Sequence, residues 1–211
     1  MFTCKKEQSI SEQEWGYQYF PLIKGHWITY EVDSTVYTSI NSIVDTQYFN
    51  YQIKEVVGSE YKDNSGNINY KIERYFREND SAAWRLKDIW ISFKDEFKAT
   101  KTEENVKFIK LTFPVKENNK WDGNAYNTMS VQEYKYRNVN KQGVVDGLFF
   151  NSCCDVLQED LITLISENYS IERYAVNVGM IYKYYRNVEK ELNQGLKSGI
   201  EYSYKLIDYG N

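Results

Sequence analysis

Proline and histidine are nearly absent from this sequence of 211 residues, which has 2 prolines and 1 histidine. Alanine is also scarce, and leucine is no more common than isoleucine or valine. Because alanine and leucine are the strongest helix formers, this composition is poorly suited to helices. The 20 tyrosines, 10 phenylalanines and 5 tryptophans favour strands, since aromatic and β-branched side chains suit a pleated, half-buried surface.

Long apolar runs and an excess of positive charge are also lacking. No apolar run approaches the ~20 residues that a membrane-spanning helix needs. The formal net charge is −4, so the chain lacks the basic surface of nucleic-acid-binding proteins, and we expect no nucleic-acid partner. The length fits one domain, at the large end for a β sandwich or barrel.

The 3 cysteines form no C-x-x-C motif or Cys/His cluster, and no EF-hand, H-E-x-x-H or P-loop spacing occurs. We therefore expect no metal site and no cofactor. Cys153 and Cys154 are adjacent, so in a strand they point to opposite faces. We expect both to be ordinary thiols, with a strained vicinal disulfide as the alternative.

The chain begins with a short apolar segment, which is followed by Cys4, two lysines and a polar stretch over 7–14. This order resembles the end of a bacterial lipoprotein signal peptide, in which the cysteine becomes the acylated first residue. We expect lipid attachment at Cys4, a flexible tether over 1–16 and a single β domain over 17–211. Two acyl chains would anchor the protein stably to a membrane. The alternative is a frayed cytosolic N-terminus with an incidental cysteine.

An alternation of apolar and polar residues with period two runs through most of the chain. It predicts half-buried strands over 27–37, 46–57, 68–77, 88–98, 106–113, 130–139, 148–157, 161–174, 180–191 and 200–209. In 88–98 the pattern places Ile89, Ile91, Phe93 and Phe97 inward. Residues 155–166 also show helical spacing of leucine and isoleucine, so a helix there is the alternative to strand.

About ten short strands joined mostly by tight turns predict an antiparallel meander, and the fold class is all-β with few or no helices. Because one face of each strand is polar, the sheet must roll around its apolar face. We expect a barrel, a half-barrel of the lipocalin type, or a sandwich. An open sheet would leave a large apolar face exposed.

Charged residues on apolar faces are the first candidates for a site. Arg74 lies between Ile72 and Phe76, and Asp95 lies between Phe93 and Phe97. A buried charge must be paired or hydrated, and the two strands are neighbours in a meander, so Arg74 and Asp95 could meet. They could form the polar floor of a ligand cavity, or mark strand ends where the face has left the core.

Tryptophans are the second candidates. Trp27 and Trp90, with Trp84 and Trp121, could line a sugar- or lipid-binding surface or pack in the core or rim. The lone His26 would have to serve any Ser-His-Asp or Cys-His arrangement, but at a loop–strand junction we expect it to be exposed and assign no catalytic residue.

Two stretches resemble a known group of proteins: Tyr19-Phe20-Pro21-Leu22 with Gly25, Trp27 and Tyr30, and Glu172-Arg173-Tyr174-Ala175 with Val178-Gly179 and Tyr182. Together they resemble uncharacterised cell-envelope lipoproteins of Bacteroidota, over about residues 17–209. The resemblance implies export, lipidation and a β-rich fold. It implies no catalytic residues.

Three functions are consistent with these features. The first is a non-catalytic binding module for a small apolar or glycan ligand in the bacterial cell envelope, anchored through its N-terminal lipid on the periplasmic or surface face of the outer membrane. The second is a structural or assembly protein that acts through its outer sheet face or an edge. The third is a hydrolase that uses two carboxylates.

Overall fold

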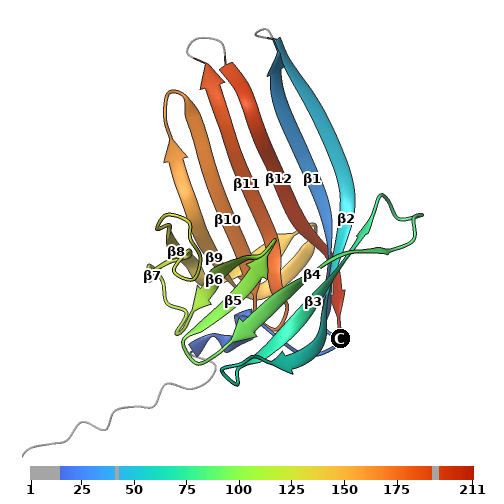
Figure 1. The fold of residues 1–211 in the computed structure, drawn as a ribbon, viewed down its shortest axis with the longest axis vertical. Coiled ribbons are helices and arrows are strands. Elements are labelled where there is room, and N and C mark those ends of the chain that lie inside the picture. Colours follow the sequence, from blue (N-terminus) through green and yellow to red (C-terminus); the bar gives the residue numbers. More distant parts are fainter. Residues whose placement is uncertain (1–14, 41–42, 192–194) are drawn as a thin grey trace, which may run out of the picture.

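The computed structural model describes residues 15–40, 43–191 and 195–211. In these ranges the chain forms one short 3-10 helix and twelve strands (Figure 1). The elements are η1 (Tyr17–Tyr19), β1 (Trp27–Ile40), β2 (Ile43–Lys62), β3 (Ile68–Arg77), β4 (Arg85–Lys94), β5 (Lys98–Glu103), β6 (Val106–Thr112), β7 (Lys120–Asp122), β8 (Glu133–Val145), β9 (Leu148–Ile162), β10 (Ser166–Ala175), β11 (Gly179–Glu191) and β12 (Gly195–Gly210). The predicted all-β class is confirmed.

A single antiparallel sheet holds all of these strands, in the order β6-β5-β4-β3-β2-β1-β12-β11-β10-β9-β8-β7. Consecutive strands pair with one another except β6 and β7, and the first strand, β1, also pairs with the last, β12. The sheet is therefore a meander that curls into a nearly closed barrel, with β6 and β7 at its two ends. Figure 1 shows β1, β2 and β10–β12 rising as a tall curved wall above a shorter, more enclosed base.

Side chains and backbone groups link the two ends of the sheet. The Ile109 N–H donates to the Gly123 carbonyl at 2.9 Å, and Trp121 Nε1 donates back to the Ile109 carbonyl at 3.0 Å. The Tyr136 hydroxyl accepts from the Thr112 N–H at 2.9 Å and donates to the Thr112 carbonyl at 2.8 Å. These bonds satisfy backbone groups at the edge of β6 that no neighbouring strand pairs, and so they close the base of the barrel.

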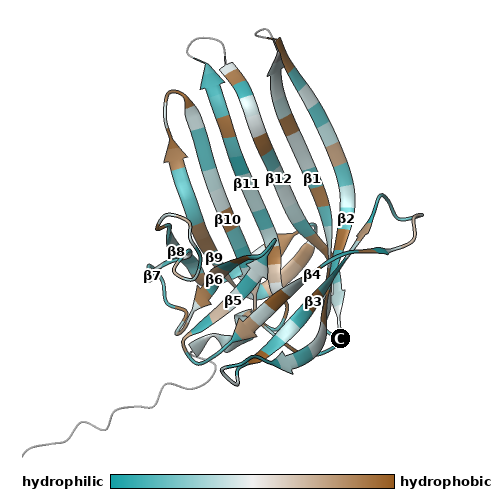
Figure 2. Cartoon of the chain, in the orientation of Figure 1, coloured by the Kyte–Doolittle hydropathy of each residue, from teal (hydrophilic) through white to brown (hydrophobic). Residues whose placement is uncertain are grey.

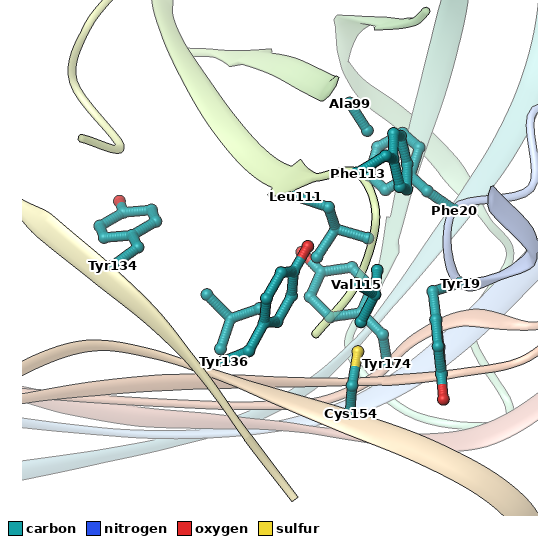
Figure 3. Close-up of a cluster of buried hydrophobic side chains, with 11 residues drawn as sticks. Tyr19, Phe20, Ala99, Leu111, Phe113, Val115, Tyr134, Tyr136, Cys154 and Tyr174 are labelled. Atoms are coloured by element: carbon teal, nitrogen blue, oxygen red, sulfur yellow. The ribbon is translucent and has the colours of Figure 1, made fainter. Parts of the chain in front are cut away.

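The base is packed by a cluster of buried side chains from the η1 segment and from β5, β6, β8, β9 and β10. Figure 3 shows its members, which are Tyr19, Phe20, Ala99, Leu111, Phe113, Val115, Tyr134, Tyr136, Cys154, Val156 and Tyr174. A second cluster, which includes Tyr30, Ile53, Cys153 and Leu206, packs around β1, β2 and β12. The segment before β1 is therefore part of the folded domain from Trp15 onward.

The neighbouring cysteines behave as strand residues should. Cys153 and Cys154 are buried free thiols, and they belong to the two different clusters. This confirms the prediction of ordinary thiols on opposite faces. Cys4 and most of the predicted tether lie outside the described residues.

The structure refines the sequence prediction in three details. The described ranges contain twelve strands, whereas the sequence pattern predicted about ten. The two strands that the pattern did not predict are the short strands β5 and β7. The predicted strand is confirmed over the helical alternative at 155–166, but β9 continues to Ile162 and the turn into β10 follows at 163–165. Figure 2 shows bands of hydrophilic and hydrophobic residues along the long strands.

The third correction concerns the faces of β4. Trp90 and Ser92 point into the barrel, so alternation turns Ile89, Ile91 and Phe93 to the opposite face. Ile89 is 50% exposed, and Phe97, in the turn after β4, is 67% exposed. The inward face of β4 is polar because it borders a cavity rather than a packed core.

Candidate functional site

A cavity of about 380 Å³, called here the main cavity, occupies the barrel above the packed base. Side chains from β1–β6 and β10–β12 line its walls, and Phe20–Leu22 with Val178 lie at its floor. Its apolar surface comes from residues such as Ile72, Trp90, Tyr202 and Tyr204. Two groups of charged side chains interrupt that surface.

The first group, the arginine cluster, consists of Glu55, Arg74, Asp88, Trp90 and Lys101. Arg74, 2% exposed, donates from Nε to Glu55 at 3.1 Å and from Nη1 to both carboxylate oxygens of Asp88 at 3.0 Å. Its guanidinium carbon lies 3.5 Å from the ring centre of Trp90, in a cation–π contact. Lys101 binds the other oxygen of Glu55 at 2.6 Å.

Because of these partners, the arginine stays charged inside the barrel. Burial alone would lower the pKa of Arg74, but the negative charges of Glu55 and Asp88 outweigh it and raise that pKa above its usual range. Two carboxylates hold the planar guanidinium in a fixed orientation against Trp90. The cluster is therefore a rigid polar wall of the main cavity.

The second group, the buried quartet, consists of Glu103, Lys110, Glu172 and Lys183. Lys110 Nζ lies 2.5 Å from Glu172 Oε1 and 3.2 Å from Glu103 Oε1. Lys183 Nζ lies 3.5 Å from Glu172 and 3.9 Å from Glu103. Glu172, with a side chain only 1% exposed, also accepts a 2.6 Å hydrogen bond from Tyr174.

All four members of the quartet are held in their charged forms. Burial by itself would raise the pKa of Glu103 and of Glu172, but the charges of Lys110 and Lys183 outweigh it and lower both. Burial would likewise lower the pKa of Lys110 and of Lys183, and the two carboxylates raise both instead. The quartet is a balanced ion network with no spare proton near neutral pH.

One hydroxyl in the main cavity has no partner. Ser92, 1% exposed, lies on the inward face of β4, and its Oγ makes no hydrogen bond to any described residue. A buried polar group without a partner costs about 1–3 kcal/mol. Ser92 is therefore an anchor point available to a polar atom of a ligand.

The structure brings together two of the four side chains predicted to bind a ligand. Arg74 and Trp90 are in contact and line the main cavity. The predicted pair of Arg74 with Asp95 is wrong, because the register of β3 and β4 places Arg74 opposite Asp88. Asp95 instead accepts backbone hydrogen bonds from Phe97 and Lys98 in the β4–β5 turn, and pairs with the Lys98 side chain at 2.7 Å.

The other tryptophans lie away from the main cavity. Trp27 is covered by the ammonium of Lys54, 4.0 Å from its ring centre, and Trp84 by the guanidinium of Arg77 at 4.5 Å. Trp121 helps to close the barrel. For these three, the rim or packing role applies, and the predicted ligand-binding role of Trp27 is not supported by its position.

His26 is buried rather than exposed, which corrects the sequence expectation. Its Nδ1 lies 2.7 Å from Asn211 Oδ1, and its Nε2 lies 2.9 Å from the Val178 carbonyl. Both ring nitrogens are thus occupied, and the histidine ties the C-terminus of β12 to the β10–β11 turn. This arrangement is structural, with no nitrogen left to act as a general base.

Sequence reasoning missed the quartet and Ser92. A signal existed for Glu172, which shares a strand face with the buried Ser170 and Tyr174. Lys110 gave no such signal in the sequence. Ile109, Lys110 and Leu111 are consecutive and all buried, so alternation along the strand does not mark the lysine as buried.

Within the described ranges, no three His, Cys, Asp or Glu side chains come together in a way that could hold a metal ion. The described part of the chain contains no helix of sufficient length and apolarity to cross a membrane. Compared with protein-family models, with curated proteins and with solved structures, the chain matches none of them.

Proposed function

We propose that this protein is a non-catalytic binding module that holds a small uncharged ligand with an apolar body in the main cavity. The observation that carries the proposal is the cavity of about 380 Å³ where a filled core would otherwise stand. Binding sites for small molecules commonly enclose roughly 300–1,000 Å³, with apolar walls and a few fixed polar groups. The main cavity has that size and that mixture.

The charges around the cavity argue for a ligand without net charge. The arginine cluster and the quartet together contribute four cations and four anions, each in an ion pair: Arg74, Lys101, Lys110 and Lys183 with Glu55, Asp88, Glu103 and Glu172. An ionic ligand that bound at either of these groups would have to break one of these pairs and leave a buried charge uncompensated. An apolar or hydroxyl-bearing ligand can pack on Trp90 and the tyrosine rings and bond to Ser92 without that cost.

The same charges disfavour the hydrolase alternative. Glycoside hydrolysis needs one carboxyl group that keeps its proton near neutral pH while a second stays ionised. Glu103 and Glu172, two carboxylates that share Lys110 and Lys183, both have lowered pKa values. Neither can serve as the general acid.

Fluorescence titration with the neutral apolar dye N-phenyl-1-naphthylamine tests the binding proposal. We expect saturable binding to the wild type, weakened about tenfold or more in Trp90→Ala, which removes the largest ring of the cavity. Trp84→Ala, which changes a tryptophan away from the cavity, is the matched control and should bind as the wild type does. Equal affinity of the two variants, or no saturable binding by the wild type, would exclude the main cavity as the binding site.

Location in the cell envelope is part of the proposal. It is supported by Cys4, by the polar stretch after it, and by the resemblance of the two aromatic motifs to Bacteroidota lipoproteins. Mass spectrometry of the protein extracted from membranes of its native cell tests it. A mature chain that starts at Cys4 and carries acyl chains is expected, whereas a soluble protein with an unmodified Cys4 would refute the anchor.

An assembly role is the second candidate function, and the outer face of β4 favours it. Ile89 is half exposed there, and the partly buried Ile91 and Phe93 follow it on the same face, so this face carries an apolar stripe. Light scattering and co-purification from envelope extracts distinguish the candidates. A complex that Ile89→Glu disrupts while dye binding persists would favour assembly.

A further inference from the structure

A second cavity, called here the polar cavity, lies against the quartet among β6, β8, β9, β10, β11 and β12. Its volume is about 400 Å³. Glu103, Lys110, Lys183 and Tyr202 line both cavities, so the quartet forms a wall that they share. Gln158, Ser170 and Tyr185 line only the polar cavity, and this distinguishes it from the main one.

An amide nitrogen without a partner points to a ligand in the polar cavity. Gln158, 7% exposed, lines it and accepts a 2.7 Å hydrogen bond from Ser170 through Oε1. Gln158 Nε2 is buried and finds no acceptor among the described residues. A buried N–H donor without a partner bears its full desolvation cost. A ligand oxygen that accepts a hydrogen bond from this donor would remove that cost, and so would bind favourably.

A β-bulge places this amide. Pairing of β9 with β10 passes from Ser170 opposite Glu159 to Ile171 opposite Leu157, so Gln158 is an extra residue in β9. The bulge brings two consecutive side chains, Gln158 and Glu159, to the cavity wall. Bulges of this kind often re-aim side chains at functional sites.

Aromatic rings form the other wall. Tyr185 and Tyr202 are stacked, with ring centres 5.0 Å apart and planes 21° apart, and the buried Tyr134 lies on the same cavity. Burial raises the pKa of Tyr134 to about 12, so its hydroxyl keeps its proton. Flat rings accept the C–H face of a sugar, while amides and hydroxyls bond to its edge.

The fixed charges on the polar cavity favour a neutral guest. They are Lys110 and Lys183 on one side and Glu103 and Glu159 on the other, which balance. The two lysines are already held by the quartet. An anion would therefore find no uncompensated cation there, and Glu159 accepts a 3.4 Å hydrogen bond from Gln132 Nε2.

We propose that the polar cavity is a carbohydrate site, in which an uncharged saccharide ring packs on the Tyr185–Tyr202 pair and one of its oxygens accepts a hydrogen bond from Gln158 Nε2. This site does not depend on what the main cavity holds. It assigns a function to the bulge in β9 and to the unpartnered amide.

The probes are neutral saccharides: glucose, galactose, N-acetylglucosamine, maltose, cellobiose and chitobiose. In amide correlation spectra of the full chain, at least one of them at about 10 mM should shift the side-chain NH₂ signal of Gln158, which is identified by its loss in Gln158→Met. Gln158→Met should weaken that saccharide about tenfold or more. Gln47→Met, which replaces an exposed amide on β2, should not change its affinity.

Gln158→Glu is a second variant, in which a carboxylate can still accept the bond from Ser170 but a negative charge replaces the Nε2 donor, so retained binding of the apolar dye is the check that it folds. It too should lose saccharide binding while it still binds the apolar dye. The proposal is overturned if none of the six saccharides moves the Gln158 signal, or if Gln158 and Gln47 variants bind equally. Loss of dye binding with saccharide binding intact would refute only the main-cavity proposal.

Discussion

Arg74 is buried among two carboxylates and a tryptophan ring, whereas Arg85 in the next strand forms an exposed pair with Glu78. Replacing Arg74 by methionine leaves Glu55 and Asp88 without their partner inside the barrel. We expect Arg74→Met to lower the free energy of unfolding by about 3–5 kcal/mol. Arg85→Met, with a side chain 66% exposed, should cost no more than about 1 kcal/mol.

Urea denaturation of both variants beside the wild type measures this difference. Similar free energies of unfolding for the two variants would mean that the arginine cluster contributes no more than a surface ion pair.

Acid should weaken the protein through Glu103 and Glu172. Their folded pKa values lie below the ordinary 4.5, since the paired lysines overcome the effect of burial. The stability they contribute is present above pH 4.5 and is lost as pH falls through the folded values. Between about pH 5 and about pH 2, the wild type should lose at least about 1 kcal/mol more free energy of unfolding than Glu103→Gln.

Chemical denaturation at a series of pH values gives the two curves. Parallel curves for the wild type and Glu103→Gln would show that the carboxylate titrates normally and that the quartet is absent in solution.

At the scale of the element, β4 is a strand whose apolar residues lie on the outer face and are not buried in the core. Ile72 in β3 is 4% exposed and Ile89 in β4 is 50% exposed. Ile72→Ala should therefore cost about 2–5 kcal/mol of unfolding free energy, while Ile89→Ala should cost less than about 1 kcal/mol. Thermal denaturation of the two variants compares their stabilities directly. A larger loss of stability in Ile89→Ala than in Ile72→Ala would support the inward orientation of Ile89 that the sequence pattern predicted.

The same strand shows what sequence reasoning could and could not reach. Alternation located most strands, because it depends only on the two faces of a strand differing. It did not reveal which face of β4 points inward, since a cavity lined by Trp90 and Ser92 reads in sequence like a solvated face. Assigning the inward face would have required knowing that the barrel is hollow.

The candidate site was predictable only where a charge broke an apolar pattern. Arg74 met that criterion, and Trp90 stood out by residue type. Asp88 was not recognised as the partner of Arg74, since cross-strand pairing depends on register and register depends on turn geometry. Lys110 and Lys183 were missed because the patterns of β6 and β11 do not separate a buried lysine from an exposed one.

At the scale of the whole molecule, the barrel depends on the contact between β6 and β8. The Tyr136 hydroxyl supplies two hydrogen bonds to the Thr112 backbone across this contact. Tyr136→Phe should cost about 1–3 kcal/mol and increase amide exchange at Thr112. Tyr48→Phe, at an exposed ring on β2, should change neither quantity. Unchanged exchange at Thr112 in Tyr136→Phe would show that the two ends of the sheet are held by other contacts.

The most direct test of the hollow, charge-balanced barrel is a crystal structure of the protein with N-phenyl-1-naphthylamine. We predict dye density in the main cavity beside Trp90 and Tyr204, with Arg74 still paired to Glu55 and Asp88 and the quartet intact. A cavity filled by the protein's own side chains, or dye bound only on the outer face of the sheet, would contradict the account.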